Sequence, residues 1–517
     1  METTRLTTAQ ALVKFLTNQF VRLEDGSEQP LFAGVWAIFG HGNVAGIGEA
    51  LYQVKDRLPT YRGHNEQSMA HIAIAFSKAR QRQQIMVATS SIGPGATNMV
   101  TAAAVAHVNR LPLLLVPGDV FASGLPDPVL QQAENFHDGS TTVNDAFRPV
   151  SRYFHRLTRP EQLIQALPKA MVALTDPAQC GPVTISVCQD VQSLAFDYPE
   201  AMFEKRVWRL RRLAPDSYEL AQTLGAVKAA RKPLIVAGGG VRYSLAEAEL
   251  QAFAEKHRIP VVETQAGKSS LVAGHEFNFG AVGVTGVTGA NTLASEADLV
   301  IAVGTRLQDF ISGSNSLFKG QVVQINVQPM DTAKYRALPC VADARRGLQL
   351  LSKELSGYQA NAEWVARANQ VRAEWREVQK DILAAEAETT IPSDAQVVAA
   401  VNQSVSDQAI IVAASGSLPA ELHKHWNSGA VGGYHLEYGY SCMGYEISGG
   451  VGVKLAEPER EVVVMVGDGS YLMMNSDIAT AVSLGLQMTI VVLDNRGFSC
   501  INRLQMATGG ANFNNLL

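Results

Sequence analysis

Two short polar motifs late in the chain have the residue types of a cation site. Residues 466–470 read VGDGS and residues 492–497 read VLDNRG, and each motif closes an apolar run. The carboxylate of Asp468 and the amide oxygen of Asn495 are hard oxygen ligands that suit Mg²⁺. The glycines beside them let backbone N–H groups approach phosphate oxygens closely. The pair therefore predicts a Mg²⁺ ion that also holds a diphosphate.

A strand–helix–strand unit is expected to position these motifs. Apolar runs at 462–466 and 489–493 predict strands, and 476–484 predicts a helix with Ile478, Ala481 and Val482 on one face. Two strands joined through a helix are expected to be parallel neighbours, so both motifs reach the same sheet edge. That edge is where α/β proteins bind ligands. Taken alone, a Gly-Asp-Gly sequence also fits a simple tight turn.

Together the two motifs resemble the thiamine-diphosphate motif, which runs from Gly-Asp-Gly to an Asn-Asn pair. The spacing from Asp468 to Asn495 is 495 − 468 = 27 positions, as in that motif. One residue departs from it, because Asp494 stands where the first Asn of the pair is usual. The resemblance implies thiamine diphosphate and Mg²⁺ as cofactors. It implies Asp468 and Asn495 as side-chain ligands of the metal, and Gly497 as a ligand through its carbonyl.

An earlier motif resembles the other half of such a site. Enzymes of this kind carry a glutamate that hydrogen-bonds the aminopyrimidine ring and thereby activates the cofactor. Glu66 takes that position, although the usual His-Glu pair is here His64-Asn65-Glu66. Without the metal motif, a solvated glutamate favoured by a helix dipole would be the simpler explanation. The resemblance implies that Glu66 is catalytic.

Further positions match along the chain. The turn at 93–98 resembles one that opens a helix near the cofactor, and Met443 takes the place of the apolar residue that bends the cofactor. A core methionine is the alternative for Met443. The cofactor-binding residues that the resemblance implies are Glu66, Gly93, Asn98, Gly416, Ser417, Met443, Gly467, Gly469 and Ser470.

Alternating strand-like and helix-like segments predict an α/β fold of three doubly wound parallel-sheet domains. We expect a pyrimidine-binding domain at 1–195, a middle Rossmann-like domain at 196–352, a helical linker at 353–390 and a diphosphate- and Mg-binding domain at 391–517. The chain stops 517 − 495 = 22 positions after Asn495. We therefore expect the last domain to be C-terminally incomplete.

Composition narrows the class of protein. At 517 residues the chain is too long for a single core, and its net charge of −5 gives no sign of nucleic-acid or membrane-surface binding. Its apolar runs have strand length and are too short to span a bilayer. Five scattered cysteines and an N-terminus without an apolar signal segment favour a cytoplasmic location.

The resemblance covers nearly the whole chain and points to the acetohydroxyacid synthase and pyruvate decarboxylase superfamily. Strings at 38–44, 264–269 and 435–446 are similar to a member from bacterial myo-inositol catabolism. That member opens a trihydroxylated cyclic 1,2-dione by hydrolysis to give 5-deoxyglucuronate. The similarity implies hydrolytic C–C ring cleavage of such a dione. An acetolactate-type 2-keto-acid carboligase and an inactive oligomerising fragment stay open as alternatives.

Hydrolysis of a polyhydroxylated dione needs more hydrogen-bonding groups than a pyruvate site. His41 and Asn43 follow the first predicted strand, His64 precedes Glu66, and Asp119 ends another strand. We expect His41 or His64 to orient or deprotonate the attacking water, because an imidazole titrates near neutrality. Asn43 and Asp119 are expected to contact the substrate. A packed structural role fits each histidine equally well.

The resemblance also implies an assembly. Glu66 and Asp468 lie in different domains but must hold opposite ends of one cofactor. In this superfamily the two domains that meet come from different chains. A homodimer or tetramer with active sites at the subunit interface is therefore implied.

Overall fold

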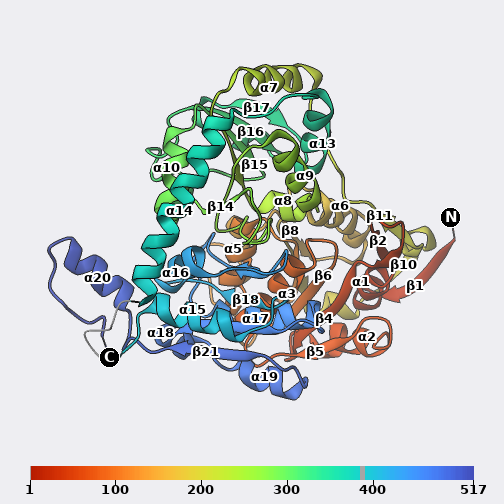
Figure 1. Ribbon diagram of the computed structural model, residues 1–517. Helices are drawn as coiled ribbons and strands as arrows, with labels where there is room; N and C mark the ends of the chain where they lie inside the picture. Colours follow the sequence, from red (N-terminus) through yellow and green to blue (C-terminus); the bar gives the residue numbers. More distant parts are fainter. Residues whose placement is uncertain (1, 385–390, 517) are drawn as a thin grey trace. The chain divides into compact units, whose positions relative to one another are not determined.

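The computed structural model describes residues 2–384 and 391–516, which form two compact units. The first unit extends to Arg211 and also takes in Gly444–Pro458 and Tyr471–Met488. The second unit holds Arg212–Met443, Glu459–Ser470 and the residues from Thr489 onward. Figure 1 labels the helices and strands of both. Of the predicted helical linker, residues 385–390 lie outside the described residues.

A six-stranded parallel sheet forms the core of the first unit, in the order β5-β4-β6-β7-β9-β8. Every residue of β6 and β9 is buried, as expected when helices cover both faces of a parallel sheet. The strands are β4 (Phe32–Ile38), β5 (Thr60–Arg62), β6 (Ile85–Ser90), β7 (Leu113–Asp119), β8 (Tyr153–Leu157) and β9 (Pro182–Cys188). Short strands β1 (Thr3–Thr7), β2 (Gln19–Arg22), β3 (Glu28–Pro30), β10 (Ala195–Pro199) and β11 (Arg206–Trp208) form two smaller sheets.

The helices of the first unit include one pair that is distant in sequence. Helix α17 packs along α3, and a Cβ at Gly452 would lie 2.4 Å from the carbonyl oxygen of Ile72, so this crossing requires a glycine. The main helices are α1 (Thr8–Leu16), α2 (Glu49–Tyr52), α3 (Glu66–Ala79), α4 (Pro94–Asn98), α5 (Val100–Asn109), α6 (Leu163–Thr175), α17 (Tyr445–Ala456) and α19 (Asp477–Ser483).

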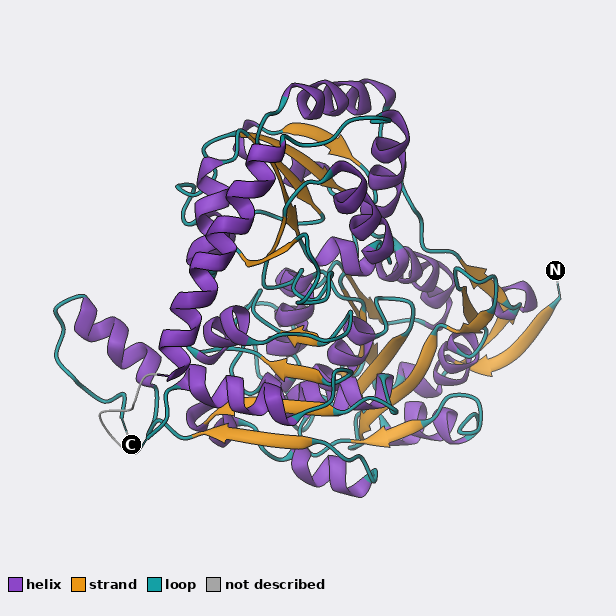
Figure 2. Ribbon diagram, in the orientation of Figure 1, coloured by secondary structure: helices purple, strands orange, loops and turns teal. Residues whose placement is uncertain are grey.

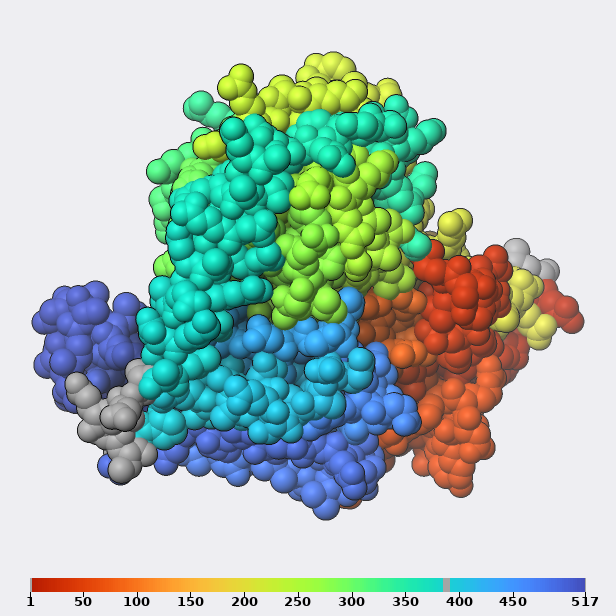
Figure 3. Space-filling view, in the orientation of Figure 1, coloured from red at the N-terminus to blue at the C-terminus, as the bar shows by residue number. Residues whose placement is uncertain are grey.

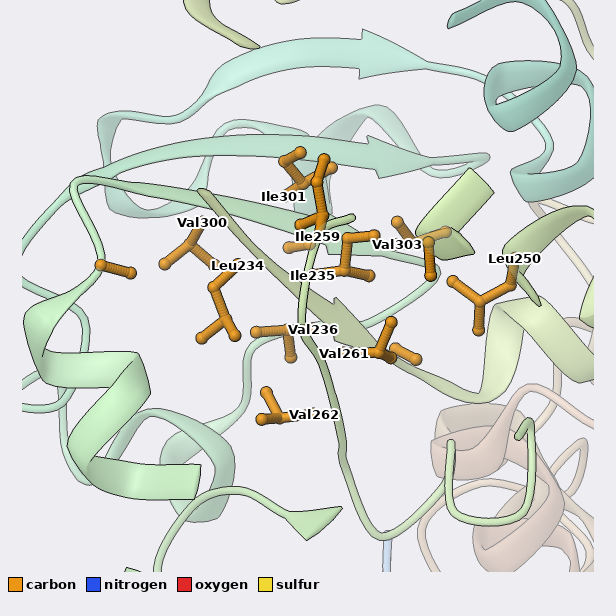
Figure 4. Close-up of a cluster of buried hydrophobic side chains, with 14 of the residues drawn as sticks. Leu234, Ile235, Val236, Leu250, Ile259, Val261, Val262, Val300, Ile301 and Val303 are labelled. Carbon is orange, nitrogen blue, oxygen red and sulfur yellow. The ribbon is translucent and has the colours of Figure 1, made fainter. Parts of the chain in front are cut away.

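The second unit contains two parallel sheets. The larger has the order β14-β13-β12-β15-β16-β17, and its central strands carry the buried aliphatic cluster drawn in Figure 4. Its strands are β12 (Pro233–Ala237), β13 (Val261–Glu263), β14 (Asn278–Ala281), β15 (Leu299–Val303), β16 (Gln321–Asn326) and β17 (Leu338–Val341). The smaller sheet has the order β19-β18-β20-β21, with β18 (Ile410–Ala413), β19 (Tyr434–Leu436), β20 (Val462–Gly467) and β21 (Thr489–Leu493).

Helices flank the larger sheet of the second unit on both faces, as Figure 2 shows. They are α7 (Ser217–Ala229), α8 (Gly239–Tyr243), α9 (Glu247–His257), α10 (Thr288–Glu296), α11 (Asp309–Ser312), α12 (Pro329–Thr332), α13 (Ala344–Glu354) and α14 (Ala362–Ala384). Helices α15 (Asp394–Ser404) and α16 (Leu418–His425) pack with the smaller sheet. Helix α18 (Asp468–Met473) follows β20 directly, and α20 (Ser499–Ala507) buries none of its residues. In the space-filling view, the dark blue α20 segment stands out from the surface (Figure 3).

The predicted fold class is confirmed, since three parallel sheets alternate with helices along the chain. β20 and β21 are parallel neighbours joined through α19, as expected for the two polar motifs. The predicted apolar face of that helix is confirmed at Ala481 and wrong at Val482. Val482 is 74% exposed, whereas Asp477, Thr480 and Ala481 are buried.

The glycines after β12 pack against the end of β15, because a Cβ at Gly240 would lie 2.5 Å from Gly304 Cα. In the part of the chain that the structure describes, no helix combines the length and the apolar character needed to cross a membrane. The predicted domain boundaries and the predicted incompleteness of the last domain stay predictions.

Candidate active site

Asp468 lies at the point where β20 ends and α18 begins. Its side chain is 7% exposed, and its Oδ2 accepts a 2.6 Å hydrogen bond from the backbone N–H of Gly497. Gly497 follows the neighbouring strand β21 and has a φ of 120°, which favours glycine. The parallel pairing of β20 with β21 thus brings the two polar motifs together.

Three oxygen atoms converge at this sheet edge. The side-chain oxygen of Asn495 lies 3.3 Å from Asp468 Oδ1 and 2.9 Å from the carbonyl oxygen of Gly497. Mg²⁺ binds oxygens at 2.0–2.1 Å in an octahedron, so neighbouring ligand oxygens lie about 3 Å apart. With the amide oxygen of Asn495 turned toward Asp468 and Gly497, both of its oxygen–oxygen distances are close to that value. Turning the Asn495 amide over would let its NH₂ donate to the same oxygens, so the amide orientation should report whether a cation is present.

Glycines beside this oxygen cluster leave space next to the backbone. A Cβ at Gly467 or Gly416 would meet no atom within 4 Å, and Gly416 has a φ of 91°. Gly416 and Ser417 follow β18, the parallel neighbour of β20, so they reach the same edge as Asp468. Gly469 differs, because a Cβ there would lie 2.7 Å from the Phe498 ring. Open backbone beside three oxygens suits a diphosphate held by a metal.

Met443 ends a loop whose shape depends on a buried carboxylate. Glu437 is 2% exposed and accepts hydrogen bonds from the backbone N–H groups of Tyr440 at 2.9 Å and Cys442 at 2.7 Å. Sequence reasoning gave Glu437 no role. The sequence signal that could have identified Glu437 is its place as an acidic residue within the polar and aromatic segment 435–446. Among the described residues, His, Cys, Asp and Glu side chains form no group of three or more that could hold a metal by themselves.

Glu66 is the first residue of α3 in the first unit. Asn65 caps the helix by accepting a 3.1 Å hydrogen bond from the Ser68 N–H. Asn98 Nδ2 donates to Glu66 Oε2 at 2.9 Å, which leaves Oε1 as the free oxygen of this half-buried carboxyl. A Cβ at Gly95 would lie 3.1 Å from that Oε1, so the glycine keeps the space beside it open.

The turn at Gly93 is held by a segment that sequence reasoning did not single out. Gly93 has a φ of 61°, and a Cβ there would lie 1.7 Å from the carbonyl oxygen of Gln131. The same Gln131 uses Oε1 to contact His41 Nε2 at 3.0 Å. The carbonyl oxygen of His41 accepts a 2.8 Å bond from Gln189. His41 itself is exposed.

His64 belongs to a hydrogen-bonded chain that ends on a buried carboxylate. Its Nδ1 lies 2.8 Å from Thr480 Oγ1, and that hydroxyl donates to Asp477 Oδ1 at 2.9 Å. Asp477 also accepts from Ser448 Oγ at 2.6 Å. A hydroxyl has a single proton, so Thr480 must accept from His64 Nδ1–H. The neutral imidazole then presents its lone pair on Nε2.

The two residues expected to contact substrate are saturated by the protein. Asn43 is 1% exposed and bonds the Gly40 N–H at 3.0 Å and the Thr89 hydroxyl at 3.3 Å. Asp119 is fully buried, and its oxygens accept from Arg156 Nε at 2.9 Å, Ser186 Oγ at 2.6 Å and the Val120 N–H at 2.8 Å. These contacts favour a supporting role for both side chains.

The predicted site residues thus fall into two sets, one in each unit. Comparison with known proteins shows to which family the chain belongs. Sequence families described as the thiamine pyrophosphate enzyme N-terminal TPP binding domain, central domain and C-terminal TPP binding domain match residues 33–138, 220–351 and 414–516. The chain belongs to the thiamine pyrophosphate enzyme family. This confirms the predicted superfamily and the order of its three parts.

Several proteins are similar to this one over almost the full chain. The 3D-(3,5/4)-trihydroxycyclohexane-1,2-dione hydrolase of Geobacillus thermodenitrificans is 48% identical over 537 residues, covering 99% of this chain and 83% of the relative. A protein named as the same hydrolase, number 2, from Bacillus cereus strain ZK is 45% identical over 539 residues, covering 99% and 84%. The Bacillus cereus strain AH820 hydrolase is 46% identical, with the same coverage.

Proposed function

We propose that this thiamine pyrophosphate enzyme hydrolyses a C–C bond of a cyclic 1,2-dione, with trihydroxycyclohexane-1,2-dione as substrate and 5-deoxyglucuronate as product. The convergence of Asp468, Asn495 and Gly497 oxygens carries the cofactor half of this proposal. The names of relatives at 45–48% identity support the substrate half over a 2-keto-acid carboligase. Water adds to one carbonyl carbon, and the bond to its neighbouring carbonyl carbon breaks. The hydrated carbon becomes the carboxylate, and the neighbouring carbon keeps the electron pair of the broken bond, takes up a proton and becomes the aldehyde.

Asp468, Asn495 and the Gly497 carbonyl would bind Mg²⁺, with the diphosphate along the open backbone at Gly416 and Gly467. When bound, thiamine diphosphate supplies the carbon nucleophile that adds to a substrate carbonyl. Glu66 would hold or release a proton at Oε1 toward the aminopyrimidine ring. Asn98 Nδ2 donates to the other oxygen, Oε2, at 2.9 Å and so fixes the orientation of the carboxyl group, with Oε1 as the atom that exchanges the proton.

His64 is the better-oriented group to take a proton from the attacking water. The hydrogen bonds from His64 Nδ1 to Thr480 and from Thr480 to Asp477 place the lone pair of the imidazole on Nε2. In this arrangement the Asp477 carboxylate orients the base through the Thr480 hydroxyl. His41 is held only by the neutral amide of Gln131, so we assign it to contact substrate hydroxyls. Asn43 and Asp119 would fix the loops behind it.

The ring-cleavage proposal is tested by assaying the purified enzyme, loaded with thiamine diphosphate and Mg²⁺, on the cyclic dione and on pyruvate. We expect release of one acid equivalent per dione consumed, and neither acetolactate nor carbon dioxide from pyruvate. Turnover of pyruvate without turnover of the dione would establish the carboligase alternative instead. An enzyme that binds cofactor but turns over neither substrate would favour the inactive fragment.

The two histidines are separated by single substitutions. His64→Gln should lower kcat for ring cleavage about 100-fold, the lower end of a general-base contribution, because no group then accepts the water proton. His41→Ala should mainly raise KM, since it removes a substrate contact. Both variants should bind cofactor like the wild type. Equal loss of cofactor affinity and activity in either variant would overturn its assignment.

We also propose a homodimer or tetramer in which the cofactor lies between subunits, and a cytoplasmic enzyme. Family membership supports the assembly, because Glu66 and Asp468 occur in different units of one chain. All five cysteines lie among the described residues and none of them forms a disulfide, which supports a reducing compartment. The domain boundaries at 195, 352 and 390 remain part of this proposal, and the matched families fall within them. Light scattering of the purified protein tests the oligomer.

A further inference from the structure

A cavity in the second unit shares no residue with the cofactor loops. It encloses about 660 Å³ of space, including its open mouth. Its wall combines the segment after β13, strand β14, helix α14 and the end of α16. One part of the wall is apolar, with Leu271, Phe279 and Trp375. The string at 264–269, which resembles the dione-opening enzyme, contributes Lys268 and Ser269 to the other part.

The charged groups of the cavity are unbalanced. Lys268, Arg372 and Arg376 line it, and Lys424, which lies 3.2 Å from Glu421, adds a fourth cation that is already paired. Arg372 and Arg376 are four residues apart on α14, a spacing at which like charges repel. Burial first, and then the neighbouring Arg376, lower the pKa of Arg372. Burial also lowers the pKa of Lys268 to about 8.

Glu263 is the single acid of the cavity wall, and it is already used. One of its oxygens accepts a 3.0 Å bond from the Leu271 N–H, and the other accepts a 3.3 Å bond from Asn278 Nδ2. Its charge also offsets part of that of Lys268. One carboxylate against Lys268, Arg372 and Arg376 leaves the wall with a net positive charge.

Hydrogen-bond donors are also in surplus. The hydroxyls of Ser269 and Ser428 are 1% and 5% exposed by residue and have no partner among the described residues. Lys268 Nζ donates to one backbone carbonyl, that of His423, at 3.0 Å. Arg376 makes no hydrogen bond or ion pair within the described ranges. Arg372 already donates to Glu276 O and to Asn369 Oδ1, both at 2.6 Å. The donors left over among the described residues are therefore those of Ser269, Ser428 and Arg376. Such donors beside a net positive charge match an anion, which brings acceptors.

We propose that this cavity binds a small organic anion, whose phosphate or carboxylate group meets Lys268, Arg372 and Arg376. Its apolar part lies against Trp375 and Phe279. The site is separate from the cofactor site and would act as an effector or product-binding site. This proposal does not depend on ring cleavage, since it rests on the cavity wall alone.

The test is calorimetric titration of the holoenzyme, saturated with thiamine diphosphate and Mg²⁺ so that the diphosphate site is filled. Inorganic phosphate and glucuronate are the two probes, because the first is a phosphate and the second carries a carboxylate. We expect saturable binding of at least one probe. Arg376→Gln, which removes an exposed side chain without a hydrogen bond, should weaken it about tenfold by removing one charge-assisted contact. Ser428→Ala should weaken it about threefold.

Lys353→Gln is the matched control, because it removes one positive charge from α13, which contributes nothing to the cavity wall. It should leave the affinity unchanged. If neither probe binds at concentrations up to about 10 mM, the proposal is overturned, because a specific site would bind more tightly than that. Equal weakening by Arg376→Gln and Lys353→Gln would also overturn it, since the effect would then come from net charge.

Discussion

Asp468 and Asp119 are both buried aspartates at the carboxyl ends of parallel strands, yet their surroundings differ. Asp119 is fully buried, with a guanidinium, a hydroxyl and a backbone N–H on its two oxygens. Asp468 has one backbone N–H on Oδ2, while its Oδ1 faces the side-chain oxygen of Asn495. One carboxylate is completed by backbone, hydroxyl and guanidinium donors, whereas the other has Oδ1 directed at Asn495, where either a cation or the turned amide completes it.

Whether a buried carboxylate has all its hydrogen bonds from the protein distinguishes a structural residue from a ligand-binding residue more reliably than its position at a strand end does. A buried polar group with its hydrogen bonds complete stabilises the fold and has nothing left for a ligand. A group with free acceptors beside open backbone is arranged for a partner from solution. By this criterion Glu66, with Oε1 free, belongs with Asp468, whereas Asn43 belongs with Asp119.

The largest effect is expected at Glu66. Glu66→Gln keeps the bond from Asn98 but removes the exchangeable proton at Oε1, so kcat should fall about 10²–10⁴-fold. Cofactor affinity should change by less than about threefold, because the amide still fills the same space. Steady-state kinetics and calorimetry measure the two quantities. A variant with nearly normal kcat would place Glu66 with the scaffold groups.

Asp119→Asn should act on stability instead. It removes the charge that pairs with Arg156, a side chain that is 14% exposed, and leaves that guanidinium with Asp145 as its acidic partner. Breaking a buried ion pair costs about 3 kcal/mol of unfolding free energy. Urea unfolding should show this loss while the dissociation constant for thiamine diphosphate stays unchanged. A stable variant that loses ring cleavage would move Asp119 into the site.

The same comparison predicts a pH effect at His423, a buried histidine with both nitrogens bonded, to Thr285 Oγ1 at 2.9 Å and Glu263 O at 3.1 Å. Burial lowers its pKa from 6.5 to about 3. As pH falls below 6.5, the unfolded chain binds a proton that the folded chain does not, so stability falls. The loss is about 2 kcal/mol between pH 6.5 and 5.0.

Calorimetric unfolding of the wild type and of His423→Gln between pH 7 and pH 5 measures this effect. The variant should show a shallower decline toward low pH because one titrating group is gone. Parallel declines in the two proteins would mean that His423 is protonated in the folded state, contrary to its complete hydrogen bonding.

The smallest effect is expected from Gln131→Met, which removes the 3.0 Å contact to His41 and preserves side-chain length. Ring-cleavage kcat/KM should fall about tenfold through a higher KM, because His41 loses its orientation. The backbone carbonyl of Gln131 would still pack against Gly93, so cofactor affinity should be unchanged. Unchanged kinetics would mean that His41 needs no support from this residue.

Much of this account could be predicted from the sequence, because the informative signals are local. Fully apolar runs gave the strands β6 and β20, since residues buried on both faces have no polar alternation. Glycine-rich motifs at strand ends pointed to Asp468 and Asn495, and the resemblance to thiamine-diphosphate enzymes pointed to Glu66. Parallel pairing then brings Asp468 and Gly497 into contact without further information.

What the sequence could not supply depends on contacts between distant segments. Thr480 is 416 positions from His64, and Gln131 is 90 positions from His41, so no spacing rule connects them. The wrong prediction for Val482 in the helix at 477–483 has a related reason. Its polar residues Asp477 and Thr480 point inward to make hydrogen bonds, whereas Val482 is exposed.

The central claim is that Asp468 and Asn495 hold a metal-bound diphosphate, and calorimetric titration of thiamine diphosphate with Mg²⁺ tests it most directly. The Asp468→Ala variant is compared with Asp494→Ala. Asp494 is an exposed aspartate next to Asn495, and its carboxylate accepts a hydrogen bond from the Arg496 N–H. We predict saturable, Mg²⁺-dependent binding that weakens more than about 100-fold in Asp468→Ala and stays within about threefold in Asp494→Ala. Equal binding by the wild type and Asp468→Ala would contradict the account.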